Sequence, residues 1–122
     1  RFTTTYGPNA REQMLIPSLI RDDVSYINVD HSRDFIHVDD LCGAIILMID
    51  KNEYGVIDIG TGVSHKLVDI MSHFDINYES RIGTEIERLD NKADISVLTK
   101  YGWQAKYNLI DYINDERMKR IN

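Results

Sequence analysis

The sequence has a single cysteine and no long apolar run, and each absence excludes a class of protein. Cys42 has no second cysteine to pair with, so an internal disulfide is impossible and a reducing compartment is favoured. Its apolar neighbours indicate that the thiol packs in the core. The longest apolar run, residues 44–49, is far shorter than the ~20 residues of a membrane span. We therefore expect no membrane contact and a cytoplasmic location.

The sequence also lacks an excess of basic over acidic residues. The formal net charge is -6, so the chain lacks the cationic surface that binds the phosphates of a nucleic acid, and we expect no nucleic-acid partner. The four histidines show no ligand spacing with cysteine or carboxylates, so the sequence predicts no metal site. No serine lies in a strand-turn-helix nucleophile elbow, which leaves hydrolase chemistry without support. Hydrophobic residues make up 43% of the chain, which favours a packed domain over a disordered one.

The first half of the sequence shows strand and helix patterns in short units. The predicted elements are a strand over residues 1–6, a helix over 13–21, strands over 25–29 and 34–38, and a helix over 41–49. Gly7-Pro8 ends the first strand, and His37 alternates in its strand as a solvent-facing residue. Asp39 and Asp40 carry carboxylates that can accept the free amide protons at a helix start. The helix that follows is apolar on nearly every side, which predicts that it is buried.

The second half continues in the same way. The predicted elements are a buried strand over residues 54–59, a helix after Ser64, a strand within 76–92, and helices over 94–101 and 108–119. Ser64 is placed to cap its helix, and Gly102 follows the next helix in a C-cap position. No repeat, linker or low-complexity tract interrupts the order. The sequence therefore predicts one small α/β domain of mixed α+β character over residues 1–122.

Few residues are candidates for binding chemistry. The Gly60-Thr61-Gly62 turn has two of the three glycines of a nicotinamide-binding turn, with His65 where the third should lie, so a structural turn is the favoured interpretation. The remaining candidates are arginines beside turn residues, whose planar guanidinium groups can bind phosphate or carboxylate through two parallel hydrogen bonds. They are Arg1, Arg11, Arg33 and Arg88. From composition alone, a surface residue is the favoured interpretation of each.

Several motifs in a fixed order resemble a known family. They are Arg1-Phe2-Thr3-Thr4-Thr5-Tyr6-Gly7-Pro8, Arg33-Asp34-Phe35-Ile36-His37-Val38-Asp39-Asp40, Asp58-Ile59-Gly60-Thr61-Gly62, Ala93-Asp94-Ile95-Ser96 and Gly102-Trp103. This series resembles the C-terminal part of the extended short-chain dehydrogenase/reductases, the family of NAD-dependent nucleotide-sugar epimerases and dehydratases. The resemblance implies a small substrate-binding domain for a nucleotide sugar. Residues 1–8 would be the last strand and turn of a Rossmann sheet whose other strands lie outside the chain.

The resemblance also implies roles for single residues. Thr4 and Tyr6 would lie at the edge of the active-site cleft, and Asp39 and Asp40 would be structural. Arg33 matches the family arginine that contacts the diphosphate of the nucleotide sugar. Arg88 lies where a second nucleotide-contacting arginine is often found, although the stretch that follows it is shorter here.

Three residues favour one branch of the family. Many relatives carry asparagine at the position of Thr4, whereas Thr4 with Arg11 and Met14 resembles the enzymes that epimerise nucleotide-linked uronic acids, such as UDP-glucuronate 4-epimerases. In that branch the threonine and the arginine face the carboxylate of the sugar, and a guanidinium pairs naturally with a carboxylate. A neutral-sugar epimerase or dehydratase remains an alternative.

The family's catalytic motifs have no match in the chain. The Gly-rich first turn is missing, and none of the seven tyrosines is followed four residues later by lysine, so the Tyr-x-x-x-Lys pair is missing too. The chain also opens inside a predicted strand, so we expect it to be a fragment. The missing N-terminal Rossmann domain would bind NAD. The chain itself is expected to bind no cofactor and to have no catalytic residue. Surfaces left bare by that domain predict self-association. The alternative is a stand-alone, non-catalytic binding or interaction module.

Overall fold

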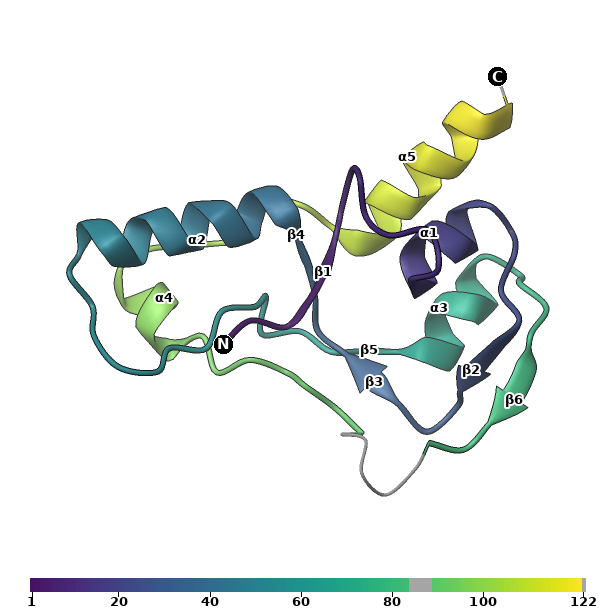
Figure 1. The fold of residues 1–122 in the computed structure, drawn as a ribbon, viewed down its shortest axis with the longest axis horizontal. Helices are drawn as coiled ribbons and strands as arrows, with labels where there is room; N and C mark the ends of the chain where they lie inside the picture. The colour runs from purple at the N-terminus through teal and green to yellow at the C-terminus, as the bar shows by residue number, and fades with distance from the viewer. Residues whose placement is uncertain (84–88, 122) are drawn as a thin grey trace.

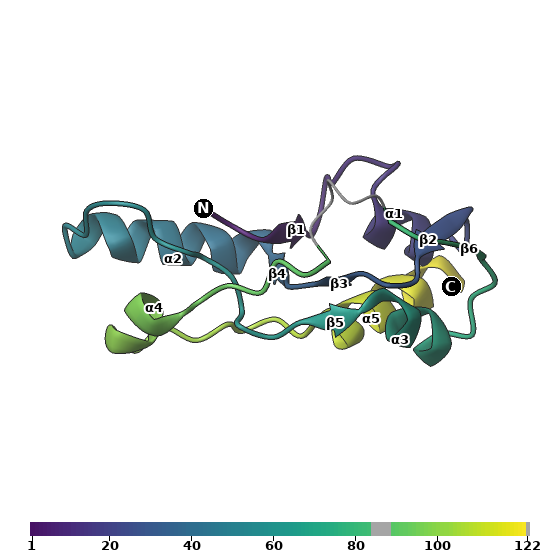
Figure 2. The same cartoon turned by 90° about the horizontal axis from the view of Figure 1, so that it is seen from below.

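The computed structural model describes residues 1–83 and 89–121 and shows a mixed α/β fold built from short elements (Figure 1). In chain order the elements are β1 (Thr4–Tyr6), α1 (Leu15–Ile20), β2 (Tyr26–Asn28), β3 (Ser32–Arg33), β4 (Phe35–His37), α2 (Val38–Asp50), β5 (His65–Lys66), α3 (Leu67–His73), β6 (Glu79–Arg81), α4 (Ser96–Lys100) and α5 (Leu109–Ile121). Seen from below, α2 and β1 lie on one side of the molecule, with α4 and α3 on the other (Figure 2).

Parallel strand pairs organise the fold. β1 pairs with β4, with Thr4 opposite Phe35 and Tyr6 opposite His37, and Phe2 forms a single parallel bridge with Ile59. Parallel neighbours need a long crossover, which the segment with α1, β2 and β3 supplies for β1 and β4. β2 pairs in parallel with β6, and β3 pairs antiparallel with β5. The strand predicted within residues 76–92 is therefore confirmed as β6.

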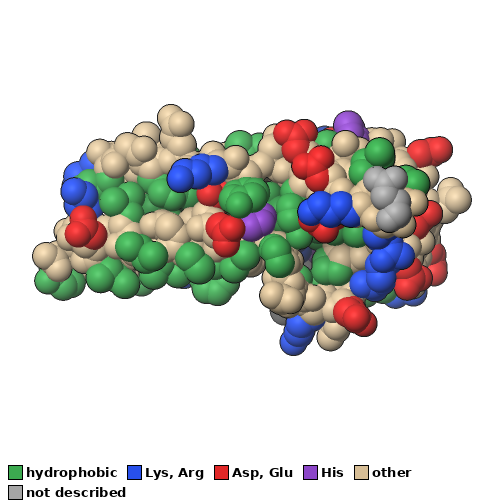
Figure 3. All heavy atoms as spheres, turned by 90° about the horizontal axis from the view of Figure 1, so that it is seen from above, with side chains coloured by type: hydrophobic (Ala, Val, Ile, Leu, Met, Phe, Trp, Pro, Cys, Tyr) green, Lys and Arg blue, Asp and Glu red, His purple; other side chains and the backbone are tan. Residues whose placement is uncertain are grey.

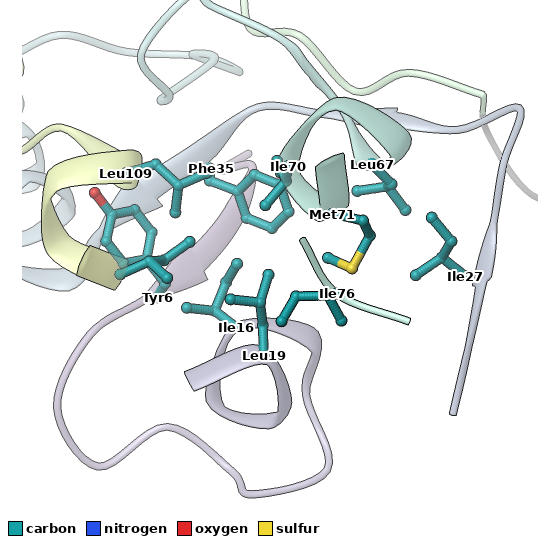
Figure 4. Packing of buried hydrophobic residues seen from close by; sticks show 11 residues of the cluster. Tyr6, Ile16, Leu19, Ile27, Phe35, Leu67, Ile70, Met71, Ile76 and Leu109 are labelled. Atoms are coloured by element: carbon teal, nitrogen blue, oxygen red, sulfur yellow. The ribbon is translucent and has the colours of Figure 1, made fainter. Parts of the chain in front are cut away.

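Two hydrophobic clusters form the core, and β4 contributes to both. Successive side chains of a strand point to opposite faces, so Phe35 enters one cluster and Ile36 the other. The larger cluster joins α1, α3 and α5 to β1 and β2 (Figure 4). The smaller one lies between α2 and α4 and includes Leu41, Met48 and Leu98. Packing on both sides of β4 fixes the segment that begins at Arg33.

The start of α2 differs from the prediction. The helix begins at Val38, and its N-cap is His37, whose Nδ1 accepts the amide proton of Asp39 at 3.0 Å. The side chain of His37 is 3% exposed, so the prediction of a solvent-facing residue is wrong. Asp40 is also buried, and its carboxylate accepts the amide protons of Lys106 and Tyr107 at 3.0–3.1 Å. Asp40 thus fastens the segment before α5 rather than capping its own helix.

Three further predictions are corrected. Residues 54–59 form no strand beyond the bridge at Ile59, where the backbone pairs with the short stretch at residues 1–3. Ser64 does not cap α3, since the N-cap is Lys66 and the Ser64 hydroxyl donates to Asp90. Cys42 is exposed on α2 rather than packed in the core. α4, followed by Gly102 at φ +78, and α5 agree with the sequence.

Candidate functional site

A buried carboxylate joins three of the sequence motifs through hydrogen bonds. Asp34, just before β4, is fully buried. Its Oδ1 accepts from the amide and the hydroxyl of Thr61 at 3.0 and 2.6 Å, and its Oδ2 accepts from the amides of Gly62 and Ala93 at 2.9 and 3.2 Å. One side chain therefore joins three segments that are far apart in the sequence. Such charge-assisted bonds are the strong ones in a protein interior.

Asn91 links the same centre to Thr4. Its Oδ1 accepts the amide proton of Asp34 at 2.7 Å, and its Nδ2 donates to Thr4 Oγ1 at 3.0 Å. The amide of Thr4 in turn donates to the carbonyl of Asp34 at 3.0 Å. Thr4 is therefore fixed through both its backbone and its hydroxyl. Sequence reasoning identified Thr4 but missed Asn91, which has no local pattern to mark it.

Arg33 lies next to this centre, on β3. Its Nη1 donates to the carbonyls of Ser32 and Leu89 at 2.7 and 3.2 Å, and its Nη2 lies 3.1 Å from Nδ1 of His31. Arg33 is half-buried, so these contacts orient the guanidinium at the edge of the molecule. Because Thr4 lies opposite Phe35, the structure brings Thr4 and Arg33 close to the same end of the β1–β4 pair.

The other predicted site residues lie elsewhere. Arg11 is exposed in the loop between β1 and α1. Tyr6 is 2% exposed and belongs to the larger core cluster, so its side chain packs inside the domain and its predicted contact with substrate stays a prediction. Arg88 lies outside the described residues. No contact joins Arg11 to Thr4 or Arg33 among the residues that the structure describes.

An aromatic cluster surrounds Tyr6. Its ring meets His37 edge to face at 5.3 Å and Tyr112 at 5.0 Å, and His37 stacks on Tyr107 with 3.6 Å between ring centroids. Burial, and next the Asp40 carboxylate, raises the pKa of the Tyr6 hydroxyl well above its usual value. Tyr6 therefore stays protonated at neutral pH, and the cluster acts as packing at the carboxyl end of β1.

The surface clefts of the described residues include two between helical and strand segments. One of about 560 Å³ lies between α4 and the start of α5, with Phe35, His65, Trp103 and Tyr107 in its wall. The other, of about 480 Å³, lies between α1 and β2, where Arg21, Tyr26 and Asn28 line it. The guanidinium of Arg81 covers the ring of Tyr26 at 3.7 Å. Neither cleft is lined by Thr4, Arg11 or Arg33.

The glycine turn does not fit a dinucleotide. A pyrophosphate site needs free backbone N–H groups, and those of Thr61 and Gly62 donate to Asp34 instead. A Cβ at Gly60 would lie 2.7 Å from Ala93 and Thr3, so this glycine serves close packing. The structural interpretation of the turn is thus confirmed. Across residues 1–83 and 89–121, no cluster of three or more metal-ligating side chains occurs. Nor does any helix within those ranges have the length and apolar character to cross a membrane.

Comparison with known proteins identifies the family. The sequence model of the NAD dependent epimerase/dehydratase family matches residues 1–60, the part that contains β1, Arg33, Asp34 and α2. Together with the relatives described next, this match supports an extended short-chain dehydrogenase/reductase. CDP-abequose synthase from Salmonella muenchen is 26% identical to it over 126 residues, which cover 89% of this chain and 43% of that protein.

Solved structures of the family share the fold. MoeE5 in complex with UDP-glucuronic acid and NAD is 27% identical, with a TM-score of 0.76, over 100% of this chain and 46% of MoeE5. MoeE5 is also known in complex with UDP-glucose and NAD. UDP-glucuronic acid 4-epimerase from Bacillus cereus is 21% identical, with a TM-score of 0.78, over 100% of this chain and 45% of that enzyme. The predicted extended short-chain dehydrogenase/reductase fold is thus confirmed, and the chain spans less than half the length of these relatives.

Proposed function

We propose that the chain forms the nucleotide-sugar-binding part of an NAD-dependent epimerase or dehydratase that acts on a nucleotide uronate such as UDP-glucuronate. The observation that carries the proposal is the Thr4–Asp34–Asn91 network beside the oriented guanidinium of Arg33. It lies at the amino ends of the parallel strands β1 and β4, where Thr4 is opposite Phe35.

Two arginines bind different charged groups of the substrate in this proposal. Arg33, held by two carbonyls, contacts the diphosphate, for which a planar guanidinium offers paired donors. Arg88 would add a second donor to the nucleotide. Arg11 contacts the sugar carboxylate from its exposed loop, and the Thr4 hydroxyl, whose oxygen accepts from Asn91, keeps its proton for the same carboxylate. MoeE5, which accommodates both UDP-glucuronic acid and UDP-glucose, supports a site of this kind.

NAD belongs, in this proposal, to the part of the parent enzyme that the chain does not span. The cofactor supplies hydride transfer at the sugar carbon. The residues of this chain bind and orient the nucleotide sugar, so the chain alone is inactive and holds no NAD. Its expected cytoplasmic location, which cell fractionation would check, also stays a prediction.

The test uses a protein in which the remaining part of MoeE5 is joined ahead of Arg1, called the MoeE5 fusion. Loss of a charge-assisted hydrogen bond costs about 1.5–3 kcal/mol, or roughly ten- to a hundred-fold in affinity. Calorimetry should show that Arg33→Ala weakens UDP-glucuronic acid and UDP-glucose alike. Arg11→Ala should weaken UDP-glucuronic acid far more than UDP-glucose, because only the uronate has a carboxylate to pair.

The same titrations separate the rival functions. Equal losses with Arg11→Ala would exclude the uronate and favour a neutral-sugar epimerase or dehydratase, a reading that the UDP-glucose complex of MoeE5 also supports. A fusion that binds NAD but neither nucleotide sugar would instead favour a non-catalytic binding or interaction module. Arg21→Ala, on the wall of the cleft between α1 and β2, is a matched control for loss of a surface guanidinium.

A further inference from the structure

The side-chain amide of Asn91 has only one orientation that satisfies its neighbours. The residue is half-buried, and its Oδ1 lies 2.7 Å from the backbone nitrogen of Asp34. A backbone N–H can only donate, so the oxygen of the side-chain amide must face it. The NH2 group of Asn91 is thereby turned toward Thr4 and donates to its hydroxyl oxygen at 3.0 Å. Asn91 therefore fixes the Thr4 oxygen as an acceptor.

The hydroxyl of Thr4 differs from those of the threonines on either side. Side chains alternate along an extended chain, so Thr3 and Thr5 point away from the face that carries Thr4. Their hydroxyl oxygens are buried without a hydrogen-bond partner among the described residues. A hydroxyl has one proton and two lone pairs, and the bond from Asn91 occupies a lone pair only. Thr4 therefore keeps a proton that it can donate to a ligand.

Surface charge does not by itself favour an anionic ligand. The formal net charge is -6, and on the face shown in Figure 3 acidic side chains lie among the basic ones. Binding of a sugar carboxylate on such a protein depends on individually placed donors. A carboxylate can only accept hydrogen bonds, whereas a sugar hydroxyl can also donate one. The direction of the Thr4 hydroxyl can thus discriminate between a uronate and a neutral sugar.

We propose that Asn91 is a specificity-determining residue. By fixing Thr4 as a donor, it adapts the site to a sugar group that accepts a hydrogen bond, such as the carboxylate of a uronate. Asn91 acts through Thr4, so it is a positioning residue and not a catalytic one. This proposal rests on the proposed function and adds the residue that favours a uronate over a neutral sugar.

The change Asn91→Asp in the MoeE5 fusion should reverse the direction of the Thr4 hydroxyl with little change of shape. One carboxylate oxygen still accepts from the amide of Asp34. The other oxygen can only accept, so the Thr4 hydroxyl donates to it and presents lone pairs to the ligand. Calorimetry should show that affinity for UDP-glucuronic acid falls by about tenfold or more, while affinity for UDP-glucose changes less than about threefold. Damage to the fold would lower both affinities alike.

Matched variants separate the direction of the hydroxyl from charge and packing. Asn108→Asp adds the same charge at another asparagine whose Oδ1 accepts a backbone amide proton, that of Asp111 at 3.0 Å, and should leave both affinities unchanged. Thr5→Val removes a neighbouring hydroxyl that has no partner among the described residues, and should leave their ratio unchanged. In the Thr4→Val background no hydroxyl can turn, so Asn91→Asp should lose most of its effect on the ratio.

A second measurement needs no change at Asn91. Thr4→Val removes the donor itself and should weaken UDP-glucuronic acid more than UDP-glucose in the fusion. In the NMR spectrum of the chain, Thr4→Val should also shift the side-chain amide resonances of Asn91, because their acceptor is lost, and Thr5→Val should not. Resonances of Asn91 that do not respond to Thr4→Val would contradict the hydrogen bond on which the proposal depends.

The titrations also distinguish the ways in which the proposal can fail. Equal changes in the two affinities with Asn91→Asp, including no change, would overturn it and leave Asn91 a purely structural role. A uronate loss that persists undiminished in the Thr4→Val background would overturn it as well, because charge alone would then be responsible. A fusion that binds neither nucleotide sugar before any substitution contradicts the proposed function itself, which is a different result from either of these.

Discussion

At the scale of single residues, Asp34 shows how one carboxylate can hold a site together. Its two oxygens accept four hydrogen bonds from Thr61, Gly62 and Ala93, and its own amide is fixed by Asn91. Burial of a charge is unfavourable unless it is fully hydrogen-bonded, and here the donors are mainly backbone amides, which cannot move away. The position of Thr4 and Arg33 thus depends on hydrogen bonds to a residue that does not itself face solvent.

The change Asp34→Asn should therefore be costly despite its similar shape. The amide group would place N–H donors against the amides that now donate to the carboxylate, which leaves buried groups unpaired. We expect the free energy of unfolding to fall by about 3 kcal/mol in urea titrations. Asp22→Asn is the control, because Asp22 is exposed at φ 60, a conformation that asparagine tolerates. A loss below about 1 kcal/mol for Asp34→Asn would show that the network is not tightly coupled.

Sequence reasoning found part of this site. Arg33 and Thr4 were identified because they belong to a motif series. No local pattern marks Asp34 beyond its place in a motif, since its importance depends on donors that come from residues 61–62 and 93, far along the chain. The same limit applies to His37. The alternating pattern of its strand predicts a solvent-facing side chain, but the ring of Tyr107, which is far along the sequence, covers it.

At the scale of the elements, helical spacing and the glycine that follows a helix were reliable signals, whereas an apolar run alone did not reveal burial or strand pairing. Gly102 marked the end of α4, and helical spacing identified α3 and α5. The apolar run at residues 41–49 predicted a buried helix, yet α2 is covered on one side only. The β-like run at 54–59 found no strand beyond the bridge to Phe2. Both outcomes depend on long-range contacts that a local apolar pattern does not specify.

A pair of glycines tests the local part of this argument. Gly43 lies inside α2 and Gly102 follows α4 at φ +78, and a Cβ at either position would meet no atom within 4 Å. Only backbone conformation therefore distinguishes them. Gly43→Ala should raise the free energy of unfolding by about 0.5–1 kcal/mol, because alanine favours the helix, whereas Gly102→Ala should lower it by about 1 kcal/mol. Thermal or urea unfolding measures both, and changes of the same sign would contradict the assignment of Gly102 as the helix-ending residue.

At the scale of the whole molecule, the chain has a hydrophobic core and one exposed apolar surface of the kind that folded proteins normally bury. The larger cluster joins six elements, which come from both ends of the sequence. The smaller cluster, by contrast, packs against one face of α2 only. The other face of α2 carries Cys42, Ile45, Ile46 and Ile49, the outer stripe, and is exposed. Contiguous exposed apolar surface of this kind mediates association in soluble proteins.

We therefore expect the isolated chain to self-associate weakly through the outer stripe. Sedimentation velocity over a range of concentrations should show oligomers that grow with concentration, in contrast to a monomeric MoeE5 fusion. Burial of one isoleucine contributes about 1.5–3 kcal/mol, so Ile46→Asp should raise the dissociation constant about tenfold or more. Ile121→Asp removes an equally exposed isoleucine from α5 and should leave the association unchanged. A strictly monomeric chain at high concentration, or equal effects of the two changes, would show that the outer stripe is not the adhesive surface.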